Sequence, residues 1–376
     1  MAKKGMGRRD FLKSSFASMG GFIYLSSTEK PLQEKSGERK ETEKKMTYRV
    51  LGKTGIRMPV ITMGVMNTDN PNLVRAALNA GMFHLDTAQT YQRGTNEAMI
   101  GEVLKGRPRG SFAISTKARL PGDRKTGLYP PEATEEAFAK KIDTSLKSLG
   151  LDYIDIYHHH GIQVREAALY EPILKALEKA KKAGKIRFIG ITTHQNEPEV
   201  IRAAVESAEA GLGVITMKAI GGNVRGSYTS ETIDAPAALK WALQDPNVHT
   251  VIAGFTTFDQ MNLDLEIMKD ITLMQSEKDH LRRATQWAGL YCQGCGQCLG
   301  QCAKQLPIPD LMRAYMYVYG YRNLVEAQDL LFSLNLPSDL CGDCSSCPVK
   351  CLNRWNVSAR IQDVVRLREV PPGFVA

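Results

Sequence analysis

Short apolar segments alternate with longer amphipathic segments from Thr47 onward. The short segments predict strands over Ile61–Val65, Phe83–Thr87, Phe112–Lys117, Tyr153–His159, Arg187–Thr193, Gly213–Ala219 and Thr250–Phe255. The longer segments carry apolar residues at helical spacing, and several begin at a Pro or a capping residue. They predict helices over Asn72–Ala80, Asn96–Lys105, Thr134–Leu149, Glu171–Ala183, Glu197–Ala210 and Ala235–Leu243. Strict alternation of this kind indicates parallel strands that are joined by crossover helices.

The size and strand count of this region indicate an incomplete barrel. The elements lie within residues 47–275, about 230 residues, which suits a TIM-type (β/α) barrel better than an open sheet. No Gly-x-Gly-x-x-Gly follows the first predicted strand, which disfavours a Rossmann domain. Only seven strands are predicted, because the space between Thr193 and Gly213 holds a single helix. We therefore expect an α/β barrel that lacks one βα unit at that position.

The N-terminal segment has the features of an export signal. Arg8-Arg9 is followed by Phe11-Leu12-Lys13 and by a weakly apolar stretch, Ser14–Ser27, that is short for a bilayer span. This arrangement resembles a twin-arginine signal, and the alternative is a disordered basic tail. No clear small-x-small cleavage site follows, so a cleaved signal and an uncleaved anchor both fit. We predict export by the twin-arginine machinery to the periplasm or the outer face of the cytoplasmic membrane, with residues 28–46 as a charged linker.

The positive charge of the chain is concentrated in the same segment. The formal net charge is +9, and residues 1–46 hold 11 Lys or Arg against 6 Asp or Glu, which is a net +5. The other 330 residues therefore share only +4. No basic domain face is implied, and a nucleic-acid partner is not expected.

All eight cysteines lie in the C-terminal part of the chain. They form two quartets with the spacing Cys-x2-Cys-x2-Cys-x3-Cys, namely Cys292, Cys295, Cys298 and Cys302, then Cys341, Cys344, Cys347 and Cys351. A disulfide framework would be spread through a secreted fold, so this clustering favours a metal centre. Residues 276–376 are expected to form a small, mainly helical domain, with a helical stretch from Pro309 to Leu334 between the quartets.

The repeated spacing is typical of bacterial two-cluster ferredoxins, in which the fourth thiolate of each quartet binds the other cluster. We therefore predict two [4Fe–4S] clusters. One would be held by Cys292, Cys295, Cys298 and Cys351, and the other by Cys341, Cys344, Cys347 and Cys302. A pair of zinc sites with four cysteines each is the alternative, because zinc also binds thiolates.

Four polar residues follow or end predicted strands. Asp86, Tyr91, Lys117 and His160 would meet at one mouth, because the carboxyl ends of barrel strands share a face. A Lys ammonium beside a phenol favours the phenolate, and an Asp holds that Lys in place. The Tyr can then exchange a proton with a carbonyl or alcohol oxygen that the His orients. This set predicts proton transfer at a carbonyl or alcohol substrate.

The region around these residues resembles the aldo-keto reductase superfamily. The resemblance runs from Tyr48-Arg49-Val50-Leu51-Gly52-Lys53-Thr54-Gly55 through Asp86-x4-Tyr91, Ser115-Thr116-Lys117, Leu151-Asp152-Tyr153-Ile154-Asp155, His160-Gly161, Gly184-Lys185-Ile186-Arg187-Phe188-Ile189-Gly190 and Met217-Lys218. It implies that Asp86, Tyr91, Lys117 and His160 are the catalytic residues. His160 is chosen over His158 and His159 because Gly161 completes the His-Gly of the family.

The nicotinamide site of the family is less well matched. The resemblance places cofactor contacts at Thr193, Lys218, Gly254 and Gln260, and Met217 stands where members often have a stacking aromatic residue. The positions that would bind the 2′-phosphate of NADP are Gly254, Gln260 and Asp264, and no basic residue occurs from 254 to 264. Phosphate is bound best by Arg or Lys. We therefore expect weak or absent NADP(H) binding.

Three functions remain open at this point. The first is an aldo-keto reductase-like oxidoreductase that acts on a small carbonyl or alcohol and passes electrons through two clusters to or from a redox partner protein. The second is a non-catalytic electron-transfer protein with a degenerate barrel, and the third is a binding or structural protein with clusters that brace it. No flavin motif is visible to couple single electrons to a hydride. The four polar residues favour the enzyme.

Overall fold

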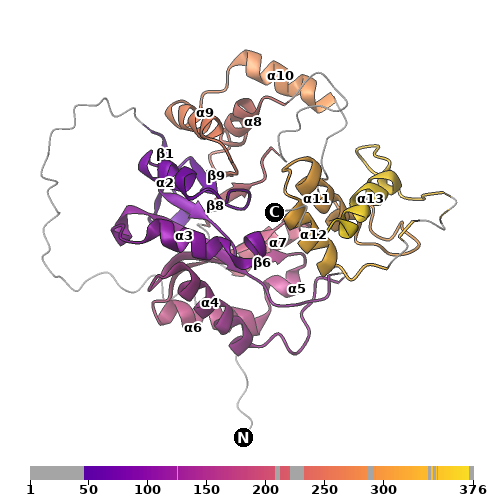
Figure 1. Cartoon of the computed structure of the whole chain (residues 1–376), viewed down its shortest axis with the longest axis horizontal. Helices are drawn as coiled ribbons and strands as arrows, with labels where there is room; N and C mark the ends of the chain where they lie inside the picture. The colour runs from indigo at the N-terminus through magenta and orange to yellow at the C-terminus, as the bar shows by residue number, and fades with distance from the viewer. Residues whose placement is uncertain are drawn as a thin grey trace, which may run out of the picture.

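The computed structural model describes residues 46–371, except 125, 208–211, 221–232, 287–291, 293, 338–339, 342–343 and 345 (Figure 1). The predicted twin-arginine signal and all but the last residue of the linker therefore lie outside the described residues. No helix within the described ranges combines the length and the apolar character needed to cross a membrane.

A parallel sheet of seven strands forms the centre of the chain. The strands are β3 (Ile61–Gly64), β4 (His84–Asp86), β5 (Ala113–Ala118), β6 (Ile154–Ile162), β7 (Ile186–Thr193), β8 (Val214–Met217) and β9 (Val248–Ala253). Their order in the sheet is β7-β6-β5-β4-β3-β9-β8. Each of the seven strands predicted from the sequence is present, which confirms a parallel, barrel-like α/β fold.

The sheet is not closed between β7 and β8. These two strands are the ends of the sheet order, and no pairing joins them among the described residues. Helix α7 (Glu197–Ser207) connects them without a further strand in the described part of the connection. A closed eight-stranded barrel would have one more strand at this position. The predicted place of the missing unit therefore coincides with the open edge of the sheet.

Helices cover the sheet at the predicted places. They are α2 (Pro71–Asn79), α3 (Asn96–Leu104), α4 (Glu135–Leu149), the one-turn α5 (Arg165–Ala168), α6 (Glu171–Lys182), α8 (Ala235–Ala242) and α9 (Phe258–Lys269). Local sequence explains their ends: the Thr134 side chain accepts a hydrogen bond from the N–H of Ala137, and Gly150 adopts a left-handed conformation after α4. In Figure 1, α4 and α6 lie on one side of the sheet and α8 and α9 on another.

A short hairpin before the first parallel strand was missed by the sequence pattern. Strands β1 (Tyr48–Val50) and β2 (Arg57–Pro59) pair antiparallel around the short helix η2 (Gly52–Thr54). Arg49 ties this hairpin to the end of α8, because it donates to the carbonyls of Leu243 at 2.7 Å and Asp245 at 3.0 Å. Three-residue strands are too short to show alternation.

The C-terminal part is helical in its described residues. It contains α10 (Gln275–Gln286), α11 (Ile308–Tyr319), α12 (Leu324–Ser333), α13 (Val357–Val365) and the short η5 (Arg366–Glu369). The predicted helical stretch 309–334 is therefore two helices with a turn at 320–323. Helix α10 contacts the barrel through an ion pair between Glu277 and Lys240 at 2.8 Å. The predicted domain boundary after residue 275 stays a prediction.

The chain has two main hydrophobic cores. The first surrounds the sheet and is built from residues such as Met63, Leu85 and Ile114. The second joins α11, α12 and α13, and it includes Met66, Ala88 and Tyr91 from the barrel mouth together with C-terminal residues. Burial of apolar surface therefore holds the C-terminal helices on the mouth of the barrel. Figure 1 shows these helices beside the barrel.

Candidate active site

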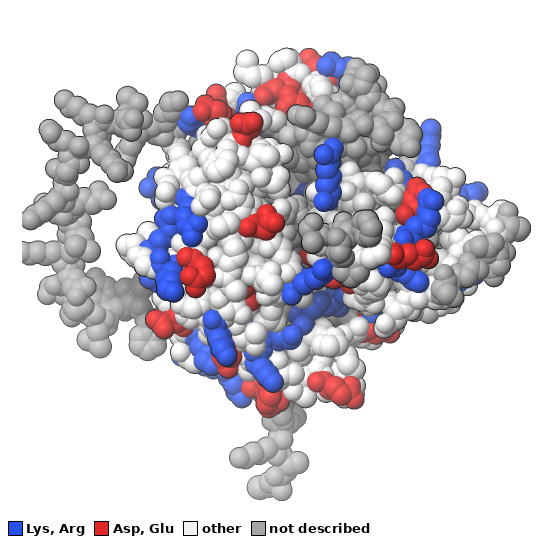
Figure 2. All heavy atoms as spheres, in the orientation of Figure 1, with Lys and Arg blue, Asp and Glu red and all other residues white. Residues whose placement is uncertain are grey.

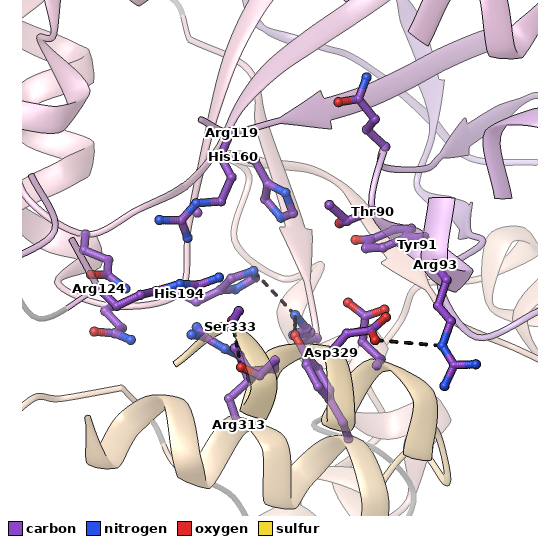
Figure 3. Close-up of a pocket in the computed structure, with 18 of the residues that line it drawn as sticks. Thr90, Tyr91, Arg93, Arg119, Arg124, His160, His194, Arg313, Asp329 and Ser333 are labelled. Carbon is purple, nitrogen blue, oxygen red and sulfur yellow. Dashed lines mark hydrogen bonds and ion pairs between the residues drawn. The ribbon is translucent and has the colours of Figure 1, made fainter. Parts of the chain in front are cut away.

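A cavity of about 510 Å³ lies between the barrel mouth and the helices α11 and α12 (Figure 3). Its lining residues are Gln89, Thr90, Tyr91, Arg93, Gly94, Arg119, Arg124, His160, Gly161, Gln163, His194, Gln195, Lys218, Arg313, Tyr317, Glu326, Asp329, Leu330 and Ser333. A cavity of this size suits a small organic ligand. We refer to it as the active-site cavity.

An ion pair lies directly beneath this cavity. The Lys117 ammonium donates to the Asp86 carboxylate and, at 2.8 Å, to the carbonyl of Thr87. The hydroxyl of Ser115 donates to the other carboxylate oxygen of Asp86 at 2.6 Å. Burial opposes ionisation of Asp86, but the charge of Lys117 and these hydrogen bonds lower the pKa of the carboxyl below its ordinary value. Both charged groups are thus fixed in place, because strands β4 and β5 are neighbours in the sheet.

Tyr91 lies above the ion pair and faces the cavity. It begins the short helix η3 (Tyr91–Gly94), whose Gln92 and Arg93 have positive φ angles of 52° and 53°. The Lys117 ammonium lies 5.0 Å from the centre of the Tyr91 ring. Asp86, Lys117 and Tyr91 therefore form one connected group, as the sequence suggested.

The protonation state of Tyr91 differs from the sequence expectation. Burial and then the negative charge of Asp86 raise the pKa of the phenol well above 10. Burial and the charge of Asp86 thus outweigh the effect that the sequence led us to expect from Lys117, which favours the phenolate. Tyr91 is therefore protonated at neutral pH, which is the state of a phenol that can donate a proton.

His160 faces the same cavity. It lies in β6 next to Gly161, whose φ is +67°, where the register of β6 on β7 shifts between His159 and Ile162. The N–H of Gly161 donates to the Thr192 hydroxyl at 2.9 Å, which holds this irregular turn. Burial and then the charge of Lys117 lower the pKa of His160 well below 6.5. A neutral imidazole can donate a hydrogen bond to a carbonyl oxygen without carrying a charge.

The two neighbouring histidines do not line the active-site cavity. The Nε2 of His159 lies 2.8 Å from the Tyr129 hydroxyl, and its ring packs against Phe138. The ring of His158 is buried against Gly190, where a Cβ atom would lie 2.1 Å from its Nδ1. Of the three histidines, only His160 can reach a substrate in this cavity.

Among the four predicted nicotinamide contacts, Lys218 lines the cavity and the other three do not. Lys218 donates to the Tyr317 hydroxyl at 3.1 Å and lies 3.4 Å from Nε2 of His194. Thr193 donates to the carbonyl of Gln195 at 2.6 Å. Gln260 accepts from the N–H of Thr256 at 2.8 Å, and Gly254 lies beside Asn67.

The predicted 2′-phosphate position carries a buried carboxyl. Asp264 lies on the inner face of α9 and is 7% exposed. Burial alone raises the pKa of its carboxyl to about 7. Neither this carboxyl nor the residues from 254 to 264 offers a positive charge to a phosphate. These residues do not fit the 2′-phosphate of NADP(H).

Several residues of the cavity were not found from the sequence. Arg119 follows Lys117 by two positions, which places both on one side of the extended end of β5. Arg313 and Tyr317 are four residues apart and share one face of α11. These spacings were visible signals, but the aromatic residues of this stretch were interpreted as packing. Tyr317 does pack in the second core, and its hydroxyl also reaches Lys218.

The eight cysteines are free thiols. Four of them, Cys292, Cys295, Cys298 and Cys351, line one small cavity. Thus the last cysteine of the second quartet lies with the first three of the first. The other four thiols are also close together. Burial raises the pKa of the Cys341 thiol, and the nearby thiols of Cys344, Cys347 and Cys302 raise it further.

Thiolates are the ligands that iron–sulfur clusters require, and four thiols around one cavity fit such a group in kind and number. Among the described residues, no group of three or more His, Cys, Asp or Glu side chains is placed so that it could hold a metal ion. The fit therefore rests on the chemistry of the thiols and on their grouping.

The first cysteine loop touches the wall of the active-site cavity. Gly294 has a φ of +69°, and a Cβ atom there would lie 2.7 Å from the carbonyl oxygen of His194. Only glycine fits this close approach to the end of β7. The loop that carries Cys292 and Cys295 is therefore packed against a residue that lines the cavity.

Comparison with known sequences finds that part of the chain is similar to a described family. Residues 62–219 match the Aldo/keto reductase family. The matched range contains Asp86, Tyr91, Lys117 and His160, and it ends before Gly254. All eight cysteines lie outside the match.

Similar proteins include reductases and dehydrogenases. The chain is 34% identical over 161 residues to L-galactose dehydrogenase from Arabidopsis thaliana, which covers 39% of this chain and 49% of that protein. It is 32% identical over 165 residues to L-glyceraldehyde 3-phosphate reductase from Escherichia coli, which covers 40% of this chain and 46% of that protein. The chain thus spans about half the length of the curated relatives it matches.

The fold also has solved counterparts. An aldo-keto reductase from Bacillus halodurans, solved in its holo form, superposes with a TM-score of 0.52 and 22% sequence identity. The superposition covers 64% of this chain and 96% of that one. The likeness shows that the two chains share their fold.

Proposed function

We propose that this protein is an aldo-keto reductase-like oxidoreductase that reduces a carbonyl group to an alcohol, or oxidises the alcohol, in the active-site cavity. The observation that carries this proposal is the placement of Tyr91 and His160 on one cavity, above the buried pair of Asp86 and Lys117. The match of residues 62–219 to the Aldo/keto reductase family supports it.

Tyr91 and His160 have complementary roles in this proposal. The Tyr91 hydroxyl donates a proton to the carbonyl oxygen, and neutral His160 donates a hydrogen bond that orients that oxygen. Lys117 lies 5.0 Å from the Tyr91 ring, so its charge stabilises the phenolate that proton donation leaves behind. Asp86 keeps Lys117 in this position. Tyr91 recovers its proton from solvent.

Reduction of one carbonyl requires two electrons and two protons. Tyr91 supplies one proton and solvent supplies the other. The nucleotide positions do not fit NADP(H), so we propose that a redox partner protein delivers or accepts the electrons one at a time. The intact set of Asp86, Tyr91, Lys117 and His160 favours an enzyme over a non-catalytic electron carrier.

We also propose that the C-terminal part holds two [4Fe–4S] clusters, which supply or accept single electrons when they are bound. Cys292, Cys295, Cys298 and Cys351 would hold one cluster, and Cys341, Cys344, Cys347 and Cys302 the other. The grouping of the first four around one cavity supports this assignment. The close approach of Gly294 to His194 supports a position of the first cluster next to the active-site cavity.

We further propose that the protein is exported by the twin-arginine route. Twin-arginine export moves folded proteins, and a chain with clusters must be assembled before it leaves the cytoplasm. Arg8-Arg9 and the apolar stretch that follows support the proposal.

A matched pair of tyrosine variants tests the proposed reaction. The full chain is purified anaerobically with its clusters, and reduction of small aldehydes such as methylglyoxal is followed with reduced methyl viologen, NADH or NADPH as the electron donor. Tyr91→Phe should lower the rate at least about 100-fold, because Phe keeps the packing and removes the proton donor.

Tyr157→Phe is the control, because Tyr157 is fully buried and does not line the cavity. Its activity should stay close to that of the parent protein. The visible spectrum of the clusters should be unchanged in both variants. Activity that survives in Tyr91→Phe would remove these residues from the mechanism, and activity with NADPH alone would contradict the proposed electron route.

A further inference from the structure

Three arginines from separate segments line the active-site cavity close to one another. Arg119 lies just after β5, Arg124 lies in the loop that follows, and Arg313 lies on α11. In Figure 3, Arg119 comes from the barrel and Arg313 from the opposite, helical side. Figure 2 shows Lys and Arg side chains in the hollow where the barrel meets the C-terminal helices. We refer to these three residues as the arginine cluster.

Two residues of the arginine cluster have no acidic partner among the described residues. Neither Arg119 nor Arg124 forms an ion pair with an acidic group among the described residues. Arg313 contacts Asp310, which precedes it by one turn on the same helix. The protein therefore holds more positive than negative charge at the arginine cluster.

The two carboxylates of the cavity are engaged elsewhere. Asp329 lies 3.9 Å from Arg93. Glu326 interacts with Lys218 and with Lys117, on the side of the cavity where Tyr91 lies. Neither of them balances the arginine cluster.

The three guanidinium groups are partly withdrawn from water and repel one another. Burial, followed by the charges of Arg119 and Arg313, lowers the pKa of Arg124 to about 10. Burial also lowers the pKa of Arg119 and of Arg313. All three stay protonated at neutral pH, so the cost of holding like charges together is not relieved by loss of a proton. A bound anion would offset this cost.

We propose that the substrate carries an anionic oxygen group, a carboxylate or a phosphate, which the arginine cluster binds while the carbonyl faces Tyr91 and His160. This inference rests on the proposed function, since it names the class of substrate for that reaction. Planar guanidinium groups bind both kinds of anion through paired hydrogen bonds.

The position of Arg119 restricts the size of the substrate. Its Nη1 lies 3.6 Å from the position of a Cβ atom on Gly161, the residue that follows His160. The anionic group would therefore lie close to the carbonyl that His160 orients. A short 2-oxo or 3-oxo acid, or a small phosphorylated aldehyde or ketone, meets this requirement.

Binding of simple anions tests the proposal without any turnover. Oxalate represents the carboxylate group and inorganic phosphate represents the phosphate group, and each is titrated by calorimetry into the full chain with its clusters. At least one anion should bind, and Arg119→Gln and Arg124→Gln should each weaken binding about 10-fold or more. The tighter anion identifies the group that the substrate carries.

Arg366→Gln is the matched control, because Arg366 is an exposed residue that pairs with Asp363 away from the cavity. It should leave anion affinity unchanged. The cluster absorbance and the thermal transition of each variant show whether it is folded, and the two arginine variants are independent of each other. Absence of binding to the parent protein, or equal binding by folded variants and parent, would overturn the proposal.

Turnover separates this inference from the proposed function. Glyoxylate carries a carboxylate beside its aldehyde, and glycolaldehyde is its neutral counterpart. The arginine variants should lower kcat/KM for glyoxylate about 10-fold or more and leave that for glycolaldehyde nearly unchanged. Equal effects on both substrates would overturn the anion site, whereas bound anions with no turnover of any carbonyl would contradict the proposed function alone.

Discussion

The Lys218 ammonium donates a hydrogen bond of 3.1 Å to the Tyr317 hydroxyl. Lys218 follows strand β8 of the barrel, and Tyr317 lies on helix α11 of the C-terminal part. Burial, together with the charge of Arg313, lowers the pKa of Lys218 to about 7. One polar contact inside the cavity therefore joins the two parts of the chain, next to the surface that the second hydrophobic core buries.

The contact between Lys218 and Tyr317 should contribute measurably to stability. A double-mutant cycle with Tyr317→Phe and Lys218→Met should give a coupling energy of about 1–2 kcal/mol at pH 6, where the ammonium is charged. Denaturant unfolding of the protein with its clusters, under anaerobic conditions, measures it. A coupling energy near zero would mean that the apolar core alone holds α11 on the barrel.

The protein should contain about eight irons and eight labile sulfides per chain. A pair of double variants tests which cysteines act together. Cys295→Ala with Cys351→Ala should leave about four irons, because both belong to one predicted set. Cys295→Ala with Cys302→Ala should leave almost none, because they belong to different sets. The reverse pattern would mean that each quartet binds its own cluster, and stoichiometric zinc with little iron would contradict the cluster assignment.

Replacement of the arginine pair at the N-terminus should block export. Arg8→Lys combined with Arg9→Lys keeps the charge but removes the guanidinium groups that the machinery recognises. The variant should stay in the cytoplasm, as measured by cell fractionation with the parent protein as reference. Unchanged export of this variant would indicate another route.

NADPH should bind poorly. The predicted 2′-phosphate positions lack a basic residue and include the buried Asp264, so we expect a Kd above about 100 μM where a complete site reaches micromolar values. NADH lacks the 2′-phosphate and should bind no more weakly than NADPH. Calorimetric titration of both nucleotides into the protein with its clusters decides the point. A micromolar Kd for NADPH would show that other residues bind the 2′-phosphate.

Asp264 should make stability depend on pH. Its folded pKa of about 7 lies above its unfolded value of 3.8, so the folded state keeps a proton that the unfolded state releases between about pH 4 and 7. Its contribution to stability is therefore lost as the pH rises through that window. The free energy of unfolding of Asp264→Asn should rise by about 3 kcal/mol relative to that of the parent protein between pH 4.5 and pH 8. Parallel stability curves for the two proteins would contradict this effect.

Much of the fold could be predicted because its strands and helices differ in length and apolar pattern. Mainly apolar segments such as Thr250–Phe255 are long enough to be recognised without an alignment. The β1–β2 hairpin was missed because its strands have three residues each. The turn that divides 309–334 was missed although Gly320 and Asn323 are local signals for it, since the Asn323 side chain caps the start of α12.

The candidate site was predicted only in part, for a different reason. Asp86 and Lys117 lie at the ends of neighbouring strands, so strand order alone brings them together. Arg124 and Arg313 meet because a C-terminal helix covers the barrel mouth, and no local pattern reports such an approach. The pKa of Tyr91 depends on burial by the same helices, so no local pattern in the sequence indicates it.

The cavity is completed by residues from the far end of the chain, and this affects how the protein matures. Tyr91 leaves the ribosome long before Arg313, Tyr317 and Glu326, so a nascent chain can hold a folded barrel with half of a cavity. During that interval Met66, Ala88 and Tyr91 lack their apolar cover and are candidates for chaperone binding. A truncated or unfinished chain would have Tyr91 but no enclosed active-site cavity. It would be inactive until α11 and α12 had packed against the barrel.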